Sequence, residues 1–86
     1  MNDNPVKEIT RPCIMVYKGY GVTQICIEYD EETGRAILYG KLDGITDLIM
    51  FQADSMREIE QSFRNAVDDY LDFCKEVGKE PERPLP

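Results

Sequence analysis

The residues that could carry out acid–base or metal chemistry are two groups of carboxylates. Asp30, Glu31 and Glu32 are consecutive, and Asp68 is followed by Asp69. A metal-dependent nuclease needs several carboxylates that converge on metal ions about 4 Å apart. The first group falls at a predicted hairpin tip, where solvation explains it, and adjacent helical residues point about 100° apart. We therefore expect no enzyme activity; a magnesium-dependent nuclease that uses the hairpin carboxylates is the enzymatic alternative.

Nucleophilic catalysis and metal binding lack their usual residues. The chain has no histidine, the side chain that most often acts as a general base near neutral pH. Its three cysteines, Cys13, Cys26 and Cys74, form no CxxC pair. Their odd number, with no secretory signal before them, favours free thiols in a reducing cytosol over disulfides or a zinc site. We expect no catalytic residue, no metal and no cofactor.

The charge balance favours a protein partner over nucleic acid or a membrane. Ten Lys and Arg stand against seventeen Asp and Glu, a formal net charge of −7. Such a surface repels phosphate, and the small cluster of Tyr17, Lys18 and Tyr20 does not offset it. A basic protein would be attracted, although net charge also simply maintains solubility. No apolar run reaches the length of a membrane span, so a cytoplasmic protein is expected.

The first half of the chain has the composition of β-strands separated by turns. Residues 22–29 alternate, with Ile25, Ile27 and Tyr29 on one face. The glycine-containing segments 19–21, 30–34 and 43–44 are typical of bends and hairpin loops. The predicted strands cover residues 13–18, 22–29, 35–42 and 48–53.

One long helix is predicted after these strands. Ser55 with Glu58 three residues later fits a capping box, and Gly78 stands where a helix would end. Between them, apolar residues recur at steps of three and four and form one face of a helix of about 22 residues. These residues are Met56, Ile59, Phe63, Ala66, Val67, Tyr70, Cys74 and Val77.

The other face of this helix is sorted by charge. One flank carries Glu58, Asp69, Asp72 and Glu76, and the other carries Arg57, Arg64 and Lys75, with Asp68 beside them. A solvated helix face explains this pattern, and a docking surface for a partner is the alternative. We take the acidic flank, Glu58, Asp69, Asp72 and Glu76, as the candidate partner-binding residues.

Together these elements predict an α+β fold. A small antiparallel sheet of three to four strands would carry one long C-terminal helix on one face. The domain would span residues 13–78, between a flexible N-terminal arm, 1–12, and a proline-rich extended tail, 79–86. One helix cannot cover all the apolar strand residues, so we expect a homodimer through the uncovered surface. The residues concerned are Ile14, Val16, Ile37, Leu38, Tyr39, Leu42, Leu48 and Met50.

Several short motifs, taken in order, resemble those of HicB antitoxins from type II toxin–antitoxin systems. The resemblance covers the chain from about Tyr17 to Pro84, and its most specific part is Ala66-Val67-Asp68-Asp69-Tyr70-Leu71 followed by Cys74 and Gly78-Lys79-Glu80-Pro81. The other matching motifs are Lys18-Gly19-Tyr20, Gly40, Gly44, Asp47-Leu48-Ile49-Met50-Phe51, Asp54-Ser55, Phe63-Arg64-Asn65 and Pro84.

This resemblance implies a fold, a partner and a function. The fold would be a partial ribonuclease-H-like domain without that fold's catalytic carboxylates. The partner would be a HicA-like toxin, a small basic ribonuclease whose active site the antitoxin covers. Many HicB proteins continue into a domain that binds the promoter of their operon; this chain ends at Pro86, which puts such autoregulation in doubt. As the charge already indicated, no direct nucleic-acid binding is expected through this domain. An orphan HicB-like domain used for oligomerisation or as an adaptor is the alternative.

Overall fold

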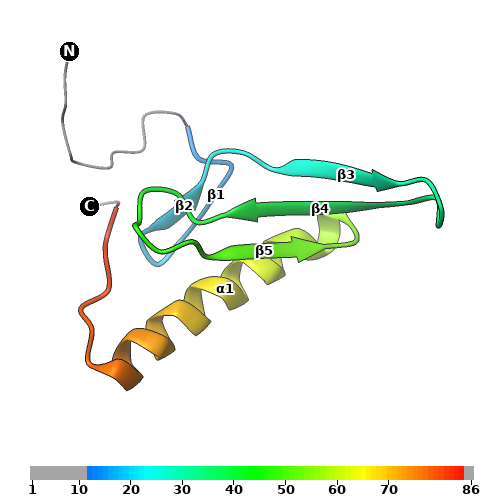
Figure 1. Cartoon of the computed structure of the whole chain (residues 1–86). Helices are drawn as coiled ribbons and strands as arrows, with labels where there is room; N and C mark the ends of the chain where they lie inside the picture. The colour runs from blue at the N-terminus through cyan, green and yellow to red at the C-terminus, as the bar shows by residue number, and fades with distance from the viewer. Residues whose placement is uncertain (1–11, 85–86) are drawn as a thin grey trace, which may run out of the picture.

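The chain folds into five short strands and one long helix. The computed structural model describes residues 12–84, so the predicted N-terminal arm lies, except for its last residue, outside the described residues. The strands are β1 (Met15–Tyr17), β2 (Tyr20–Val22), β3 (Cys26–Asp30), β4 (Arg35–Lys41) and β5 (Met50–Ala53), and the helix is α1 (Met56–Val77). Figure 1 shows α1 running across the strands, which confirms the predicted α+β class with a long C-terminal helix.

The strands form two antiparallel sheets rather than the single sheet expected. β1 pairs with β2, and β3, β4 and β5 form a separate sheet in that order. The predicted strand 22–29 is divided at residues 23–25: β2 ends at Val22, β3 begins at Cys26, and between them Thr23 donates its backbone N–H to the side chain of Asp43. The preceding turn, between β1 and β2, is made by Lys18 and Gly19, whose φ angles are 53° and 84°. Two consecutive residues with positive φ are typical of a tight hairpin turn that matches strand twist. The sequence predicted a bend at residues 19–21, and the turn lies one residue earlier, at Lys18 and Gly19.

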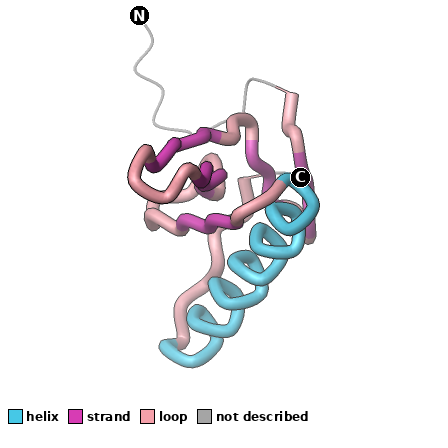
Figure 2. Tube along the Cα trace, turned by 90° about the vertical axis from the view of Figure 1, so that its right-hand side faces the viewer, coloured by secondary structure: helices cyan, strands magenta, loops and turns pink. Residues whose placement is uncertain are grey.

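The register of the larger sheet decides which side chains face the helix. Leu38 lies opposite Ala53, and Gly40 lies opposite Phe51, so these four residues share the face that packs on α1. A Cβ at Gly40 would lie only 2.9 Å from Cζ of Phe51, and glycine permits this close approach. The other face carries Tyr39 and its neighbours, and no helix covers it within the described residues; Figure 2 shows α1 on one side of the strands.

Aromatic rings dominate the contact between α1 and the sheets. Phe63 is buried, with its ring 5.6 Å from Phe51 and 6.5 Å from Tyr17, and Tyr70 meets Tyr20 edge to face at 5.7 Å. Such pairs add about 0.5–1.5 kcal/mol beyond the burial of their area. The buried residues of α1 follow the predicted helical period: Ile59, Phe63, Val67, Tyr70 and Cys74.

The ends of α1 are the predicted ones. The Ser55 side chain accepts a hydrogen bond from the backbone N–H of Glu58, so it supplies the cap expected from the sequence. Gly78 adopts a left-handed conformation with φ 72°, which ends the helix in the way the sequence predicted. Among residues 12–84, no helix has the length and apolarity that crossing a bilayer requires.

The segment after α1 packs back onto the domain. Residues 79–84 form neither helix nor strand, in agreement with the proline-rich sequence. The Tyr20 hydroxyl donates to the carbonyl of Glu82 at 2.5 Å, and the Glu82 N–H donates to the Tyr70 hydroxyl at 3.1 Å. The Glu82 carboxylate accepts from Thr46, and Lys79 pairs with Asp47. Burial raises the pKa of both tyrosines.

Candidate protein-binding surfaces

The carboxylates considered for chemistry lie in structural or solvent-exposed positions. Asp30 accepts a hydrogen bond from the N–H of Glu32 inside the exposed hairpin loop. Asp68 accepts from the Tyr17 hydroxyl at 3.3 Å and from Lys18 at 2.9 Å, and this hydrogen bond raises the pKa of Lys18. In residues 12–84 no group of three or more His, Cys, Asp or Glu side chains is placed to hold a metal ion.

Asp43 is the most constrained carboxylate, and the sequence marked it only as part of a turn. It accepts from the backbone N–H of Thr23 at 2.7 Å and from the Thr23 hydroxyl at 2.8 Å, and Lys41 lies 3.4 Å away. Burial opposes its charge, but the bonds from Thr23 outweigh this, and the pKa of Asp43 falls below its ordinary value. Asp43 therefore ties the start of the β3 segment to the turn after β4.

The acidic flank of α1 predicted as a partner-binding surface is accessible. Glu58, Asp69 and Asp72 are exposed, as is Glu76. Their spacing of 11, 3 and 4 residues keeps them within about 60° around the helix, so they form one stripe along its length. The structure thus leaves these four carboxylates available to a partner, and their role stays a prediction.

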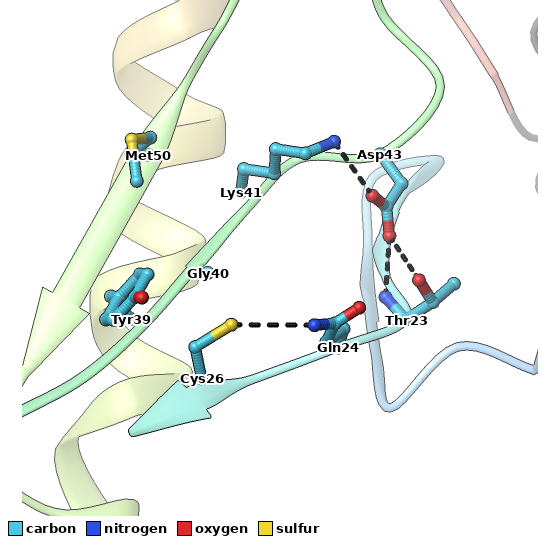
Figure 3. A pocket seen from close by; sticks show the side chains of 8 residues that line it. All are labelled: Thr23, Gln24, Cys26, Tyr39, Gly40, Lys41, Asp43 and Met50. Atoms are coloured by element: carbon cyan, nitrogen blue, oxygen red, sulfur yellow. Dashed lines mark hydrogen bonds and ion pairs between the residues drawn. The ribbon is translucent and has the colours of Figure 1, made fainter. Parts of the chain in front are cut away.

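A second surface lies on the sheet face opposite α1. A hollow of about 390 Å³ lies there. Figure 3 shows Tyr39, Cys26 and Met50 along one side of it and the Asp43 network along the other. Met50 is 54% exposed, while Tyr39 is partly buried. The Cys26 sulfur accepts a weak hydrogen bond from the Gln24 amide at 3.6 Å. The hollow is shallow and is lined by both polar and apolar side chains, so it suits contact with another protein surface.

A third surface is the far end of the β3–β4 hairpin. Ile27 and Tyr29 are 68% and 63% exposed although they lie opposite Leu38 and Ala36, on the sheet face that packs on α1. Figure 1 shows α1 nearest β5, with β3 as the strand farthest from the helix, so α1 leaves these β3 side chains uncovered. The alternation of the sequence placed both residues on one face but did not indicate that the helix would leave them uncovered.

The uncovered apolar residues only partly match those expected. Ile14, Val16, Leu48 and Met50 are exposed, as the argument for an interface requires. Leu38 and Leu42 are instead buried in the core.

Comparisons with known proteins identify no family. The chain matches no protein-family model, no curated protein and no solved structure. The resemblance to HicB antitoxins therefore rests on the motifs in the sequence.

Proposed function

We propose that this chain is a non-catalytic, antitoxin-like domain that binds a small basic HicA-type ribonuclease and covers its active site. The observation that carries the proposal is the uncovered apolar surface of the three-stranded sheet, bordered by carboxylates. Ile27 and Tyr29 are large, exposed side chains on one face of this sheet, and Met50 is exposed on its other face. Exposed apolar groups of this kind mark interaction sites, and a surrounding acidic surface selects a basic partner.

The electrostatics suit such a partner. An RNA-cleaving protein carries a positively charged surface where it holds phosphates. A domain of net charge −7 would be drawn to that surface and would compete there with RNA. Apolar anchors would then provide most of the affinity, and the charges would raise the association rate. In this proposal the chain acts in the cytoplasm, where the ribonuclease meets its RNA.

Co-expression tests this function. Growth arrested by a small basic HicA-type ribonuclease should recover when this chain is produced with it, and the two proteins should copurify. Reversing the acidic flank of α1 (Asp69→Lys with Asp72→Lys) should weaken copurification if that flank contributes. A matched reversal of the basic flank (Arg57→Glu with Lys75→Glu) serves as the control. Continued growth arrest with every such ribonuclease encoded beside the gene would contradict the proposal.

Self-association is the second candidate function, and the open sheet face favours it. A homodimer would cover Met50 and the hollow beside Tyr39 with a second copy of the same surface. An orphan domain of this kind would serve for oligomerisation or as an adaptor. Sedimentation at micromolar concentration decides: a dimer that a Met50→Lys substitution dissociates supports this function, and a stable monomer removes it.

A further inference from the structure

In the part of the chain that the structure describes, β3 is an edge strand of the larger sheet. Among residues 12–84, Cys26–Asp30 pairs with β4 alone. Figure 1 shows β3 along one border of the sheet, with α1 lying nearer β5. The outward backbone N–H and C=O groups of an edge strand can pair with another strand.

The side chains of this edge strand supply both anchors and charge. Ile27 and Tyr29 project from the face toward α1, but β3 is the strand farthest from the helix, so both are exposed. Glu28 projects from the opposite face and is also exposed. An added strand would thus meet two apolar side chains on one face and a carboxylate on the other, which is the alternation that strand addition reads.

The charge in and next to β3 is mostly negative. Between residues 26 and 35 the chain has four carboxylates, at 28, 30, 31 and 32, and one cation, Arg35. Edge strands are usually protected from pairing by lysine, proline or a bulge. Residues 26–30 contain no lysine and no proline and pair with β4 residue for residue without a bulge. Carboxylates take the place of those protections, and they repel acidic strands while attracting basic ones.

We infer that the outer edge of β3 receives an extended, basic segment of the partner protein as an additional strand. This inference rests on the proposed function and specifies where the partner binds and in what conformation. Its backbone would pair with Cys26–Asp30, its apolar side chains would cover Ile27 and Tyr29, and its Lys or Arg side chains would face Glu28 and the acidic loop.

A second copy of this chain fits the same edge less well. Antiparallel pairing centred on Glu28 would place the two Glu28 carboxylates directly opposite each other, an unfavourable like-charge pair. Pairing centred on Ile27 avoids that contact, but it still brings together two acidic loops and two chains of net charge −7. The charge pattern therefore selects a basic partner.

Substitutions at the edge of β3 test the inference. The measurement is the affinity of each variant for a catalytically inactive HicA-type ribonuclease. Ile27→Lys should weaken binding at least about tenfold, because it removes a central anchor and adds a charge that repels a basic strand. Val16→Lys makes the same charge change at a similarly exposed position, 58%, on the other sheet, and should leave affinity nearly unchanged. Equal affinities of the two variants would overturn the inference.

Amide hydrogen exchange separates failure of the inference from failure of the proposed function. The probe is a capped peptide of alternating lysine and valine, with a control peptide N-methylated at alternate amides. The first peptide, and not the second, should slow exchange at alternate amides of Cys26–Asp30. Protection of β3 by the first peptide, without binding of the ribonuclease, would support the edge site and reject a HicA-type toxin as the partner. Two results would reject the edge site. One is ribonuclease binding that leaves the β3 amides unprotected, and the other is β3 protection that depends only on the concentration of the chain itself.

Discussion

At the scale of single residues, a few side chains hold the two sheets and the helix together. Phe63 contacts a ring from each sheet, Tyr17 of the smaller and Phe51 of the larger. Asp43, which follows β4, accepts hydrogen bonds from Thr23, which precedes β3, and so joins the two ends of the β3–β4 hairpin. The helical period identified Phe63 from sequence, because a 22-residue amphipathic pattern leaves little ambiguity. It could not identify Asp43, whose role depends on a hydrogen bond to a residue 20 positions away.

Replacing Phe63 should destabilise the domain severely. Phe63→Ala is expected to cost about 3–5 kcal/mol, since it opens a cavity between both sheets and α1. Phe73→Ala is the matched control: the same change on the same helix, at a side chain 52% exposed, should cost about 0.5 kcal/mol or less. Urea unfolding followed by circular dichroism measures both. Equal effects would mean that the helix buries a different face.

The depressed pKa of Asp43 predicts a pH-dependent contribution to stability. A carboxylate with a lowered pKa in the folded state stabilises the fold above its ordinary pKa of 3.8, and this stabilisation is lost as pH falls through the folded value. Asp43→Asn should therefore cost about 1 kcal/mol near neutral pH. The difference from the unsubstituted chain should shrink below about pH 4. Unfolding curves across pH check this; a constant difference would assign Asp43 no charge-dependent role.

At the scale of elements, the helix was predictable and the division of the strands was not. Ser55 and Gly78 marked the ends of α1 through local capping chemistry, which the structure reproduces. The split into β1–β2 and β3–β4–β5 lies at residues 23–25, where Thr23 bonds to Asp43, 20 positions away. The exposure of Ile27 and Tyr29 depends on where the hairpin lies relative to the helix. Such relations between distant segments are not encoded in local periodicity.

The acidic flank of α1 should contribute to recognition and not to folding. Asp72→Ala removes an exposed carboxylate, so the free energy of unfolding should change by about 0.5 kcal/mol or less. Weaker binding of a basic partner by this variant, with unchanged melting, would assign the flank to an interface. Unchanged melting and unchanged binding would instead make the flank a solvated surface.

At the scale of the whole molecule, the segment after α1 closes one end of the core. Glu82 links Tyr20, Tyr70 and Thr46 through its backbone and its carboxylate. The prolines predicted an extended conformation, but the sequence did not show that the segment would pack back, because its partners lie 12 to 62 residues away.

The Glu82 carboxylate should matter for stability even though it lies near the end of the chain. Glu82→Ala removes its hydrogen bonds from the Thr46 N–H and hydroxyl and should lower the free energy of unfolding by about 1 kcal/mol. Glu80→Ala, two residues earlier and exposed, should have little effect. Thermal unfolding of both variants makes the comparison, and equal melting temperatures would show that the carboxylate's contacts add nothing.

The proposed function of the whole molecule is to cover a basic protein. Titrating the purified chain into a HicA-type ribonuclease during RNA cleavage tests this most directly. We predict that cleavage stops at a fixed molar ratio of the two proteins and that inhibition weakens as salt is raised, since the charges of both partners are then screened. Undiminished cleavage at a large excess of the chain, in low salt, would contradict it.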